Sequence, residues 1–330
     1  MLNSLTYFLA KSPGALDIIL NPFQLYTIPL DDWINTALDF IVQNFRPIFQ
    51  VIRYPFNLVL DGIEFVFLSL PPLIFLIAIG LIAWQVAGRN VAIYSVAALT
   101  LLGFLGTWEQ TMATLALVVT GVVFCTLVGI PLGIACARSD RLERFVLPIL
   151  DTMQTIPLFI YLVPVVMLFG IGKIPGVIAI FVVAVPPLIR LTNLGIRQVS
   201  PEAVEAAKAF GSTPSQVLWE VLLPLAMPSI LTGMNQTILF ALGMSAVASM
   251  IGVEGLGLKV LDGLARLDIG LAAIGGLGFV LLAIMLDRIV QAVSGANSQG
   301  IWQQRGPIGF LLSQWTVKNT NNISHSQFKQ

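Results

Sequence analysis

Seven long runs of apolar residues divide most of this chain into segments long enough to cross a bilayer. A transmembrane helix needs about 20 predominantly apolar residues, within a range of roughly 17 to 25. Because short polar breaks separate the runs, the pattern predicts an all-α, polytopic helical bundle of about seven transmembrane helices. The predicted spans are residues 65–87, 90–107, 111–137, 145–170, 175–192, 225–251 and 269–290.

A different pattern precedes the first run. From Trp33 to Ile52, apolar residues recur at helical spacing, and polar residues such as Asp39 and Gln43 fall between them. This periodicity is typical of an amphipathic helix. Two interpretations stay open, because such a helix either lies on the outer membrane surface or packs against the bundle.

These patterns divide the chain into three parts. We expect an N-terminal extracytoplasmic segment that holds the amphipathic helix, a transmembrane domain, and a polar cytoplasmic tail that contains the single histidine, His325. The three parts are residues 1–64, residues 65–290 with a core at 111–290, and residues 291–330.

Composition supports a membrane protein. Hydrophobic residues make up 57% of the chain and charged residues only 10%, whereas soluble domains carry about 25% charged residues. Lys plus Arg equals Asp plus Glu, at 17 each, so net charge does not suggest a nucleic-acid partner. Cys125 and Cys136 lie about 16 Å apart along one predicted helix, too far for a disulfide. With one histidine and two separated cysteines, no metal site is expected.

The distribution of Lys and Arg orients the predicted spans. Arg138, Arg141 and Arg144 lie between the third and fourth spans, and Arg190, Arg197 and Lys208 follow the fifth. Together with Arg89, Arg288 and the C-terminal cations, this side receives eleven of the 17 basic residues. Cytoplasmic loops carry the excess of basic residues. The tally therefore predicts an N-terminus outside the cytoplasm, and a cytoplasmic loop at about 200–224 with a cytoplasmic C-terminus.

That cytoplasmic loop has the punctuation of two short helices. Ser200 is a good N-cap, and Pro201 suits the first helical position, where its missing N–H costs nothing. Gly211 can end the helix in a left-handed conformation. Thr213 and Pro214 repeat the start signal for a second helix. We expect Ala203, Ala207 and Phe210 to share one face, where small alanines let a partner approach; an ordinary amphipathic loop on the bilayer is the alternative.

The stretch "EAAKAFGSTPSQVLWEVLLP" resembles the EAA loop of ABC importer permeases. That signature has EAA, three residues, Gly, nine residues, an aliphatic residue, one residue and Leu-Pro, and each spacing is present, with Val221 where isoleucine is commoner. In the family, this loop forms the coupling helix that docks into a cytoplasmic ATPase. The ATPase-coupling residues that we expect are Glu202, Ala203, Glu205, Ala206, Ala207, Phe210, Gly211, Val221, Leu223 and Pro224.

The resemblance extends from about residue 25 to 312. "LDTMQTIPLFIYLVPVVMLFGIGKIPGV" and "PLAMPSILTGMNQTILFALGMSAVASMIGVEGLG" look like the membrane subunit of bacterial glycine betaine/proline uptake systems. The resemblance implies the type I ABC importer permease fold in the bacterial inner membrane. It also implies a homodimer, a cytoplasmic ABC ATPase dimer that uses ATP-Mg, and an extracytoplasmic glycine betaine-binding protein. The implied role is osmoprotective import, with no catalysis and no cofactor in this chain.

Polar residues inside the spans are candidates for a translocation path, because polar groups in a membrane are costly and often functional. Hydrogen bonding between helices is the alternative role for such residues. We expect Asp151 to pair with a nearby arginine rather than to contact substrate. The path candidates are Gln154, Thr155, Asn235, Gln236, Ser245 and Met250.

The segment "GVEGLG" follows the sixth span on the predicted outer side. Its three glycines permit a tight turn. Glu254 and Lys259 are therefore candidates for a contact with the binding protein or for an outer gate. A plain surface turn is the alternative.

Other functions compete with this hypothesis. Lys173 is the only lysine that follows a glycine, and Ile174 comes next, so the chain contains no phosphate-binding P-loop. The permease of another small solute, such as choline, carnitine or an amino acid, is the near alternative. An ion-coupled secondary transporter, a channel or a scaffold would leave the EAA loop without a purpose.

Overall fold

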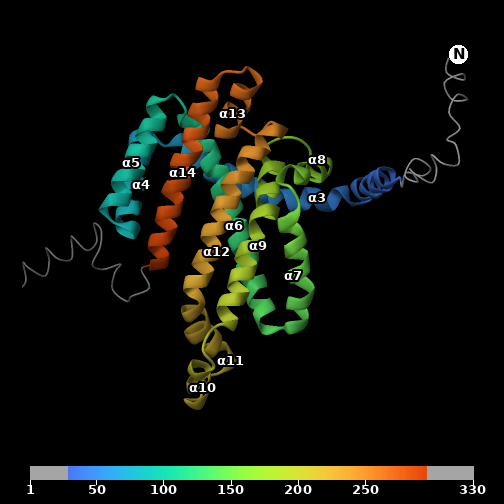
Figure 1. The fold of residues 1–330 in the computed structure, drawn as a ribbon, viewed down its shortest axis with the longest axis vertical. Coiled ribbons are helices and arrows are strands. Elements are labelled where there is room, and N and C mark those ends of the chain that lie inside the picture. The colour runs from blue at the N-terminus through green and yellow to red at the C-terminus, as the bar shows by residue number, and fades with distance from the viewer. Residues whose placement is uncertain (1–28, 296–330) are drawn as a thin grey trace, which may run out of the picture. The chain divides into compact units, whose positions relative to one another are not determined.

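The structure, a computed structural model, describes residues 29–295, and within that range the chain forms helices joined by turns (Figure 1). Of the three predicted parts, most of the C-terminal tail, including His325, lies outside the described residues. The chain divides into two units between Arg46 and Pro47. The first described helix, α3 (Leu30–Ser69), spans both units.

Helix α3 confirms a helix over Trp33–Ile52, but it is 40 residues long and continues through the boundary predicted at residue 64. Its second half packs against the bundle. Phe56 is buried and stacks on Phe124, with ring centroids 3.9 Å apart, and meets Phe181 edge-on. Packing on the bundle therefore applies to this half of α3. The three-part division of the chain stays a prediction.

The first predicted span, 65–87, is not one straight helix. Helix α3 and helix α4 (Pro72–Ala87) meet at a bend of 110°. Pro71 has an extended backbone (φ −53°, ψ 138°), because the residue before a proline is driven out of the helical region, and Pro72 follows. The expectation of one uninterrupted helix over residues 65–87 is wrong, since a proline break lies within the apolar run.

The fourth predicted span, 145–170, is broken in the same way. Helix α7 (Asp140–Thr155) and helix α8 (Leu162–Phe169) are bent by 108°, with the short 3₁₀ helix η2 (Leu158–Tyr161) between them. Pro157 again drives the preceding residue, Ile156, into an extended conformation. The Tyr161 hydroxyl donates to the Met153 carbonyl at 2.6 Å, which fixes the corner.

Four of the predicted spans are single helices of sufficient length and apolarity. They are α6 (Trp108–Arg138), α9 (Lys173–Arg197), the helical run Pro214–Ile251 that contains α12 (Leu223–Ala248), and α14 (Ile269–Gly295). Helix α5 (Arg89–Phe104) has 16 residues and is shorter than a usual span. Within residues 29–295 the structure thus has four spans, or up to six if each bent pair counts as one.

The core of the second unit is the contact of α9 with α6 on one side and α12 on the other (Figure 1). Small residues allow the helix backbones to approach closely. A Cβ atom at Gly133 of α6 would lie only 2.8 Å from the Ile189 carbonyl oxygen of α9, and one at Gly233 of α12 would lie 3.3 Å from the Pro187 carbonyl oxygen. Helix α9 is therefore held between two close neighbours along most of its length.

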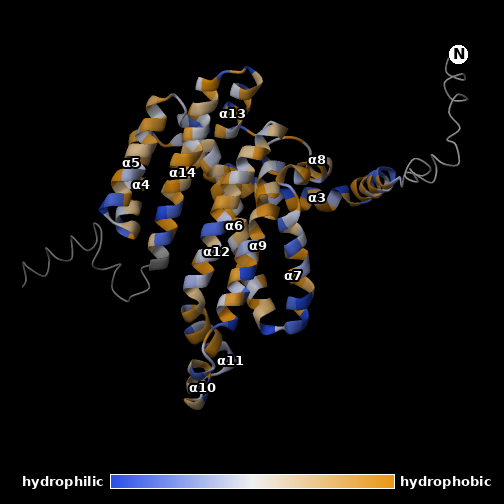
Figure 2. Ribbon diagram, in the orientation of Figure 1, coloured by the Kyte–Doolittle hydropathy of each residue, from blue (hydrophilic) through white to orange (hydrophobic). Residues whose placement is uncertain are grey.

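Helix α14 closes the other side of α12 and carries the hairpin of α4 and α5. Tyr94 of α5 reaches the Leu281 carbonyl at 3.4 Å, and Asn235 of α12 donates to Asp287 at 2.8 Å. Helix α13 (Leu256–Ala265) folds back on the start of α14. Figure 2 shows hydrophobic residues along these helices and hydrophilic residues gathered in the turn between α6 and α7.

Two ends of this unit matter for function. At one end lie α10 (Pro201–Ala209), α11 (Pro214–Gln216) and the turn between α6 and α7. At the other lie α13, α8 and the turn between α5 and α6. We refer to them as the α10 end and the α13 end.

Candidate functional site

Helix α10 forms as its sequence predicts. The Ser200 hydroxyl accepts from the Ala203 N–H at 3.4 Å, and Pro201 occupies the first turn. The helix ends at Ala209, and Gly211 adopts a left-handed conformation with φ +86°. The next N–H, of Ser212, returns to the Ala207 carbonyl at 3.1 Å, which completes a glycine C-cap. The predicted N-cap and glycine bend are both confirmed.

The second helix begins with a capping box. The Thr213 N–H donates to the Gln216 side chain at 2.8 Å, while the Gln216 N–H donates to the Thr213 hydroxyl at 3.4 Å. From Pro214 the helix runs on without a break to Ile251, through η3 (Val217–Leu222) and α12. The second half of the loop therefore continues into the sixth predicted span as one helical run.

Segment η3 is a π-helix, with a wider turn than an α-helix, and it ends two residues before Pro224. A proline inside an α-helix lacks a donor N–H and collides with the carbonyl four residues earlier, here that of Glu220. The wider turn relieves this collision without ending the helix. The Leu-Pro at the end of the motif therefore marks the junction where the loop joins α12.

The motif divides into an exposed half and a packed half. Glu202, Glu205, Ala206 and Phe210 are exposed, and Phe210 is 92% exposed. Ala203 and Ala207 are half-buried and border this exposed face. In the second half, Leu223 is buried and Val221 is half-buried. The first half can accept a partner, whereas the second half anchors the loop to the bundle.

A cavity of about 430 Å³ separates α10 from the end of α6. It is lined by Arg138 of α6, by Val204 and Lys208 of α10, and by apolar residues of η3. The side of α10 that faces the bundle is thus loosely packed. Its anchorage depends on the segments that precede and follow it.

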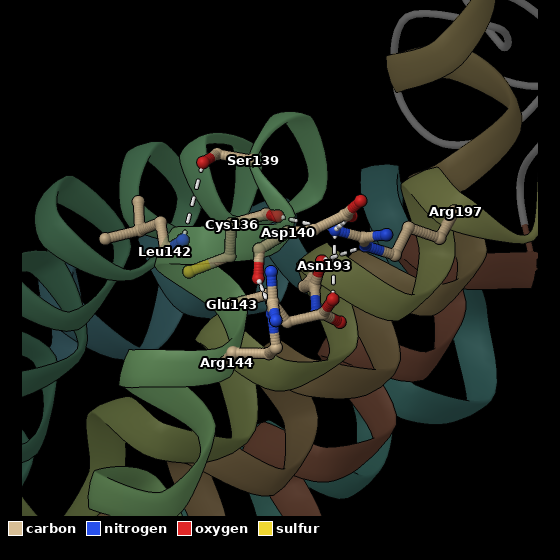
Figure 3. A network of polar contacts seen from close by, with 8 residues as sticks. All are labelled: Cys136, Ser139, Asp140, Leu142, Glu143, Arg144, Asn193 and Arg197. Carbon is tan, nitrogen blue, oxygen red and sulfur yellow. Dashed lines mark hydrogen bonds and ion pairs between the residues drawn. The ribbon is translucent and has the colours of Figure 1, made fainter.

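The segment before α10 is anchored by a polar network at the end of α9 (Figure 3). Arg197 lies 2.8 Å from Asp140 and 3.0 Å from Glu143. It also donates to the Asn193 side chain and to the Cys136 carbonyl, each at 3.0 Å. Asn193 is buried and donates to Glu143 at 2.8 Å.

This network joins three elements, the last turn of α6, the first turn of α7 and the last turn of α9. The Ser139 hydroxyl caps α7 by accepting from the Leu142 N–H at 3.4 Å. Our sequence analysis missed the network, because it treated Arg197 only as a basic loop residue. The spacing of Asn193 and Arg197 and the acidic first turn of the next helix were the available signals.

Asp151 of α7 forms an ion pair with Arg190 of α9, so the expected pairing with a nearby arginine is confirmed. Both side chains are partly exposed on the surface of the chain. Arg190 lies two turns before Arg197 on the same helix. The pair adds a second link between α7 and α9.

The path candidates do not share one environment. Gln154 and Thr155 of α7 and Gln236 of α12 are exposed, and Met250 is 62% exposed. Asn235 instead faces α14, where it donates to Asp287. The buried Ser245 hydroxyl donates to the Leu242 carbonyl within its own helix at 2.7 Å. Their role in a path stays a prediction.

At the α13 end, Glu254 and Lys259 do not pair with each other. Glu254 lies 3.1 Å from Lys173, the first residue of α9, and Lys173 also lies 2.6 Å from Glu64 of α3. Lys259 donates to the Gly106 carbonyl at 3.1 Å. A pocket of about 630 Å³ opens beside them. Sequence reasoning missed Lys173 and Glu64, which are 109 residues apart in the chain.

A sequence profile of the family described as "Binding-protein-dependent transport system inner membrane component" matches residues 129–297. This match contains the network, α10, α12 and α14. The chain belongs to this family. It is a permease component of an ABC importer, a transporter subunit and not an enzyme, and it works with an ATPase and a binding protein. Family membership excludes the secondary transporter, the channel and the scaffold.

Named relatives match nearly the whole permease. It is 49% identical over 296 residues to the glycine betaine/proline betaine transport system permease protein ProW of Escherichia coli (strain K12), covering 89% of this chain and 84% of that one. It is 43% identical over 270 residues to the glycine betaine/carnitine transport permease protein GbuB of Listeria monocytogenes serotype 1/2a (strain 10403S), covering 81% and 95%.

Solved structures resemble the fold of the permease. An inward-facing form of the MetNI methionine ABC transporter matches with a TM-score of 0.53 and 23% identity, over 58% of this chain and 95% of that one. This likeness confirms the type I importer permease fold. The permease is an inner-membrane component.

Proposed function

We propose that the permease imports glycine betaine and proline betaine-type compatible solutes for osmoprotection. The 49% identity to ProW, which extends over 89% of the chain, carries this proposal. Such solutes combine a quaternary ammonium with a carboxylate and have no net charge. A permease that also passes carnitine is the second candidate, favoured by the 43% identity to GbuB, a glycine betaine/carnitine transport permease.

In the proposed assembly, two copies of the permease form a homodimer, and an ABC ATPase dimer docks at the α10 ends. Support comes from the exposed face of α10, with Phe210 extending into solvent. Exposed aromatic residues of this kind are frequent anchors at interfaces. The partner ATPase supplies the ATP-Mg site.

Two connections would carry motion of α10 into the bundle. One is the unbroken helical run Pro214–Ile251, which extends the loop into α12. The other is Arg197, which ties the segment before α10 to α6 and α7. A two-state change of the bundle, biased by ATP at one end and by the binding protein at the other, fits these connections.

The α10 end is cytoplasmic in this proposal, and the α13 end with the N-terminus is extracytoplasmic. The basic residues of the α6–α7 turn and of α10 support this orientation. The binding protein would dock near Glu254 and Lys259. Substrate would pass the exposed polar residues Gln154, Thr155 and Gln236.

Uptake of labelled glycine betaine into proteoliposomes tests the proposal. The vesicles hold the permease with its ATPase and its binding protein, and each component is omitted in turn. Uptake that needs internal ATP and both partners, with competition by proline betaine, supports the function. Stronger competition by choline, carnitine or proline would identify that solute as the preferred substrate. Uptake by the permease alone would overturn the proposed ATP-driven mechanism.

A further inference from the structure

One ammonium group joins three segments at the α13 end. Lys173 begins α9, Glu64 lies in the last turns of α3, and Glu254 lies in the turn between Ile251 and Leu256 that leads into α13. The Lys173 Nζ lies 2.6 Å from a Glu64 oxygen and 3.1 Å from a Glu254 oxygen. These segments are far apart in the chain, so the ion pairs fix their relative position.

The two carboxylates differ in exposure. The Glu64 side chain is 15% exposed and that of Glu254 is 66% exposed. Loss of Lys173 from Glu64 would leave a largely buried carboxylate without its cation, which is unfavourable. Glu254 can return to water at little cost. The contact between Lys173 and Glu254 is therefore the one that opens first.

The turn that carries Glu254 is tied to the bundle core. Val253 packs closely on Gly176 of α9. A Cβ atom added at Gly176 would lie only 2.7 Å from the Cγ2 atom of Val253. The Leu256 N–H donates to the Thr114 hydroxyl of α6 at 2.9 Å. Gly252 and Gly255, with φ +78° and +142°, flank Val253 and Glu254 and give the turn its shape. A displacement of Glu254 would therefore be transmitted to α9 and α6 through these two contacts.

The surroundings of Glu254 favour the binding of a positively charged side chain from a partner protein. The adjacent pocket of about 630 Å³ is lined by Glu64, Glu109, Glu254 and Asp262, against Lys259 alone. The Lys259 ammonium already donates to the Gly106 carbonyl. A basic side chain that enters this pocket would meet an excess of carboxylates, and Glu254 is the most accessible partner of Lys173.

We propose that Lys173 is a positioning residue for transport, whose contacts with Glu64 and Glu254 hold the α13 end closed. The contact with Glu254 opens when a basic side chain of the docked binding protein pairs with Glu254 in place of Lys173. The proposal rests on the proposed function, because it places the binding protein at this end. Helix α9 carries the signal onward, since it is one continuous helix from Lys173 to Arg197. Docking of the binding protein would then shift the conformational equilibrium at the α10 end, where the ATPase docks in the proposed function.

ATP hydrolysis without the binding protein is the first test, measured on the permease–ATPase complex in lipid nanodiscs. The Lys173→Gln variant removes both contacts. It is expected to raise this basal rate about fivefold, the population shift for loss of the exposed contact with Glu254, which is the contact that opens on docking. Lys173→Arg keeps the charge and should restore the low rate. Arg266→Gln, which removes an exposed cation after α13 that does not line the pocket, is the matched control and should leave the rate unchanged.

A purely structural role of Lys173 predicts the opposite result. A destabilised complex would hydrolyse ATP more slowly, so a basal rate that stays unchanged or falls in Lys173→Gln overturns the proposal. Intact assembly of the variant with the ATPase is checked by gel filtration. If Lys173→Gln fails to assemble, Glu254→Gln removes the exposed contact alone and must show a raised basal rate.

Docking is the second test. The ratio of ATP hydrolysis with saturating binding protein to the basal rate should fall about fivefold with Glu254→Gln, because the contact that docking opens is already absent. Glu109→Gln, which removes a pocket carboxylate that does not contact Lys173, should change this ratio less. An unchanged ratio in Glu254→Gln would overturn the competition for Glu254. Failure of wild-type glycine betaine uptake would count against the proposed function, whereas normal uptake with an unchanged Lys173→Gln rate would count only against the proposed role of Lys173.

Discussion

Lys173 and Arg197 are the first and last residues of α9, and each is held by two carboxylates. Lys173 contacts Glu64 and Glu254 at the α13 end, and Arg197 contacts Asp140 and Glu143 at the α10 end. At 1.5 Å per residue, the 25-residue helix places them about 36 Å apart. A single helix packed between α6 and α12 thus connects the two ends at which ligands would act.

The glycine bend after α10 depends on a left-handed residue. Gly211 has φ +86°, where a β-branched side chain is strained by about 1–3 kcal/mol. Gly211→Val should leave the spans inserted but weaken ATPase binding and uptake. Gly211→Asn, which tolerates this conformation better, should retain more activity. Co-purification of the ATPase and glycine betaine uptake measure both, and normal transport by Gly211→Val would refute this role of the bend.

The exposed face of α10 should be sensitive to charge. Glu205 is exposed on α10, so Glu205→Lys reverses a charge on the proposed docking helix without disturbing packing. We expect weaker association with the ATPase by about 1–2 kcal/mol, or roughly tenfold, with a stronger effect at low salt. Asp61→Lys, on the exposed surface of α3, is the matched control. Equal ATPase association of the two variants would argue that the docking site lies elsewhere.

Arg197 should matter for both stability and coupling. Arg197→Gln removes its contacts with Asp140 and Glu143 and leaves the half-buried Glu143 without a cation, which should lower stability by about 1–3 kcal/mol. The last turn of α9, which leads into α10, would then be tied less firmly to the turn between α6 and α7. We expect ATP hydrolysis to persist while uptake per ATP falls. Arg266→Gln, an exposed arginine near the α13 end, controls for loss of charge, and unchanged uptake per ATP in Arg197→Gln would contradict the anchoring role.

The orientation can be read by labelling single cysteines in a background where Cys125 and Cys136 are replaced. Ser215 in α11 and Arg266 after α13 are both exposed and lie at opposite ends. In intact cells with a permeable outer membrane, a membrane-impermeant maleimide should label Arg266→Cys but not Ser215→Cys. Permeabilised cells should label both. The reverse pattern in intact cells would invert the proposed topology.

Local chemistry predicted the coupling loop well. Ser200, Pro201 and Gly211 act through their own backbone neighbours, so the N-cap, the first turn and the left-handed bend follow from short-range physics. The two proline breaks at Pro71–Pro72 and Pro157 had equally local signals. The length of each apolar run hid these breaks, because hydropathy is averaged over a window of residues. Such an average does not show where the helix axis changes direction.

Long-range partners could not be predicted in the same way. Asn235 and Gln236 are adjacent in the sequence, yet Asn235 turns to Asp287 while Gln236 is exposed. Which face of a transmembrane helix meets its neighbour depends on how all the helices pack. The same holds for Glu254, whose partner proved to be Lys173 and not Lys259.

Sequence patterns alone indicate a membrane protein, place its helices to within the proline breaks, and predict the two short helices of the loop at about 200–224. These properties depend on hydrophobicity, caps and turns, which act over a few residues. The packing of the helices, by contrast, was needed to identify α9 as the shared core helix and to show that carboxylates from distant segments hold both of its ends. Ion pairs between residues 39 to 109 positions apart form only when packing brings their helices together, because no local preference specifies them.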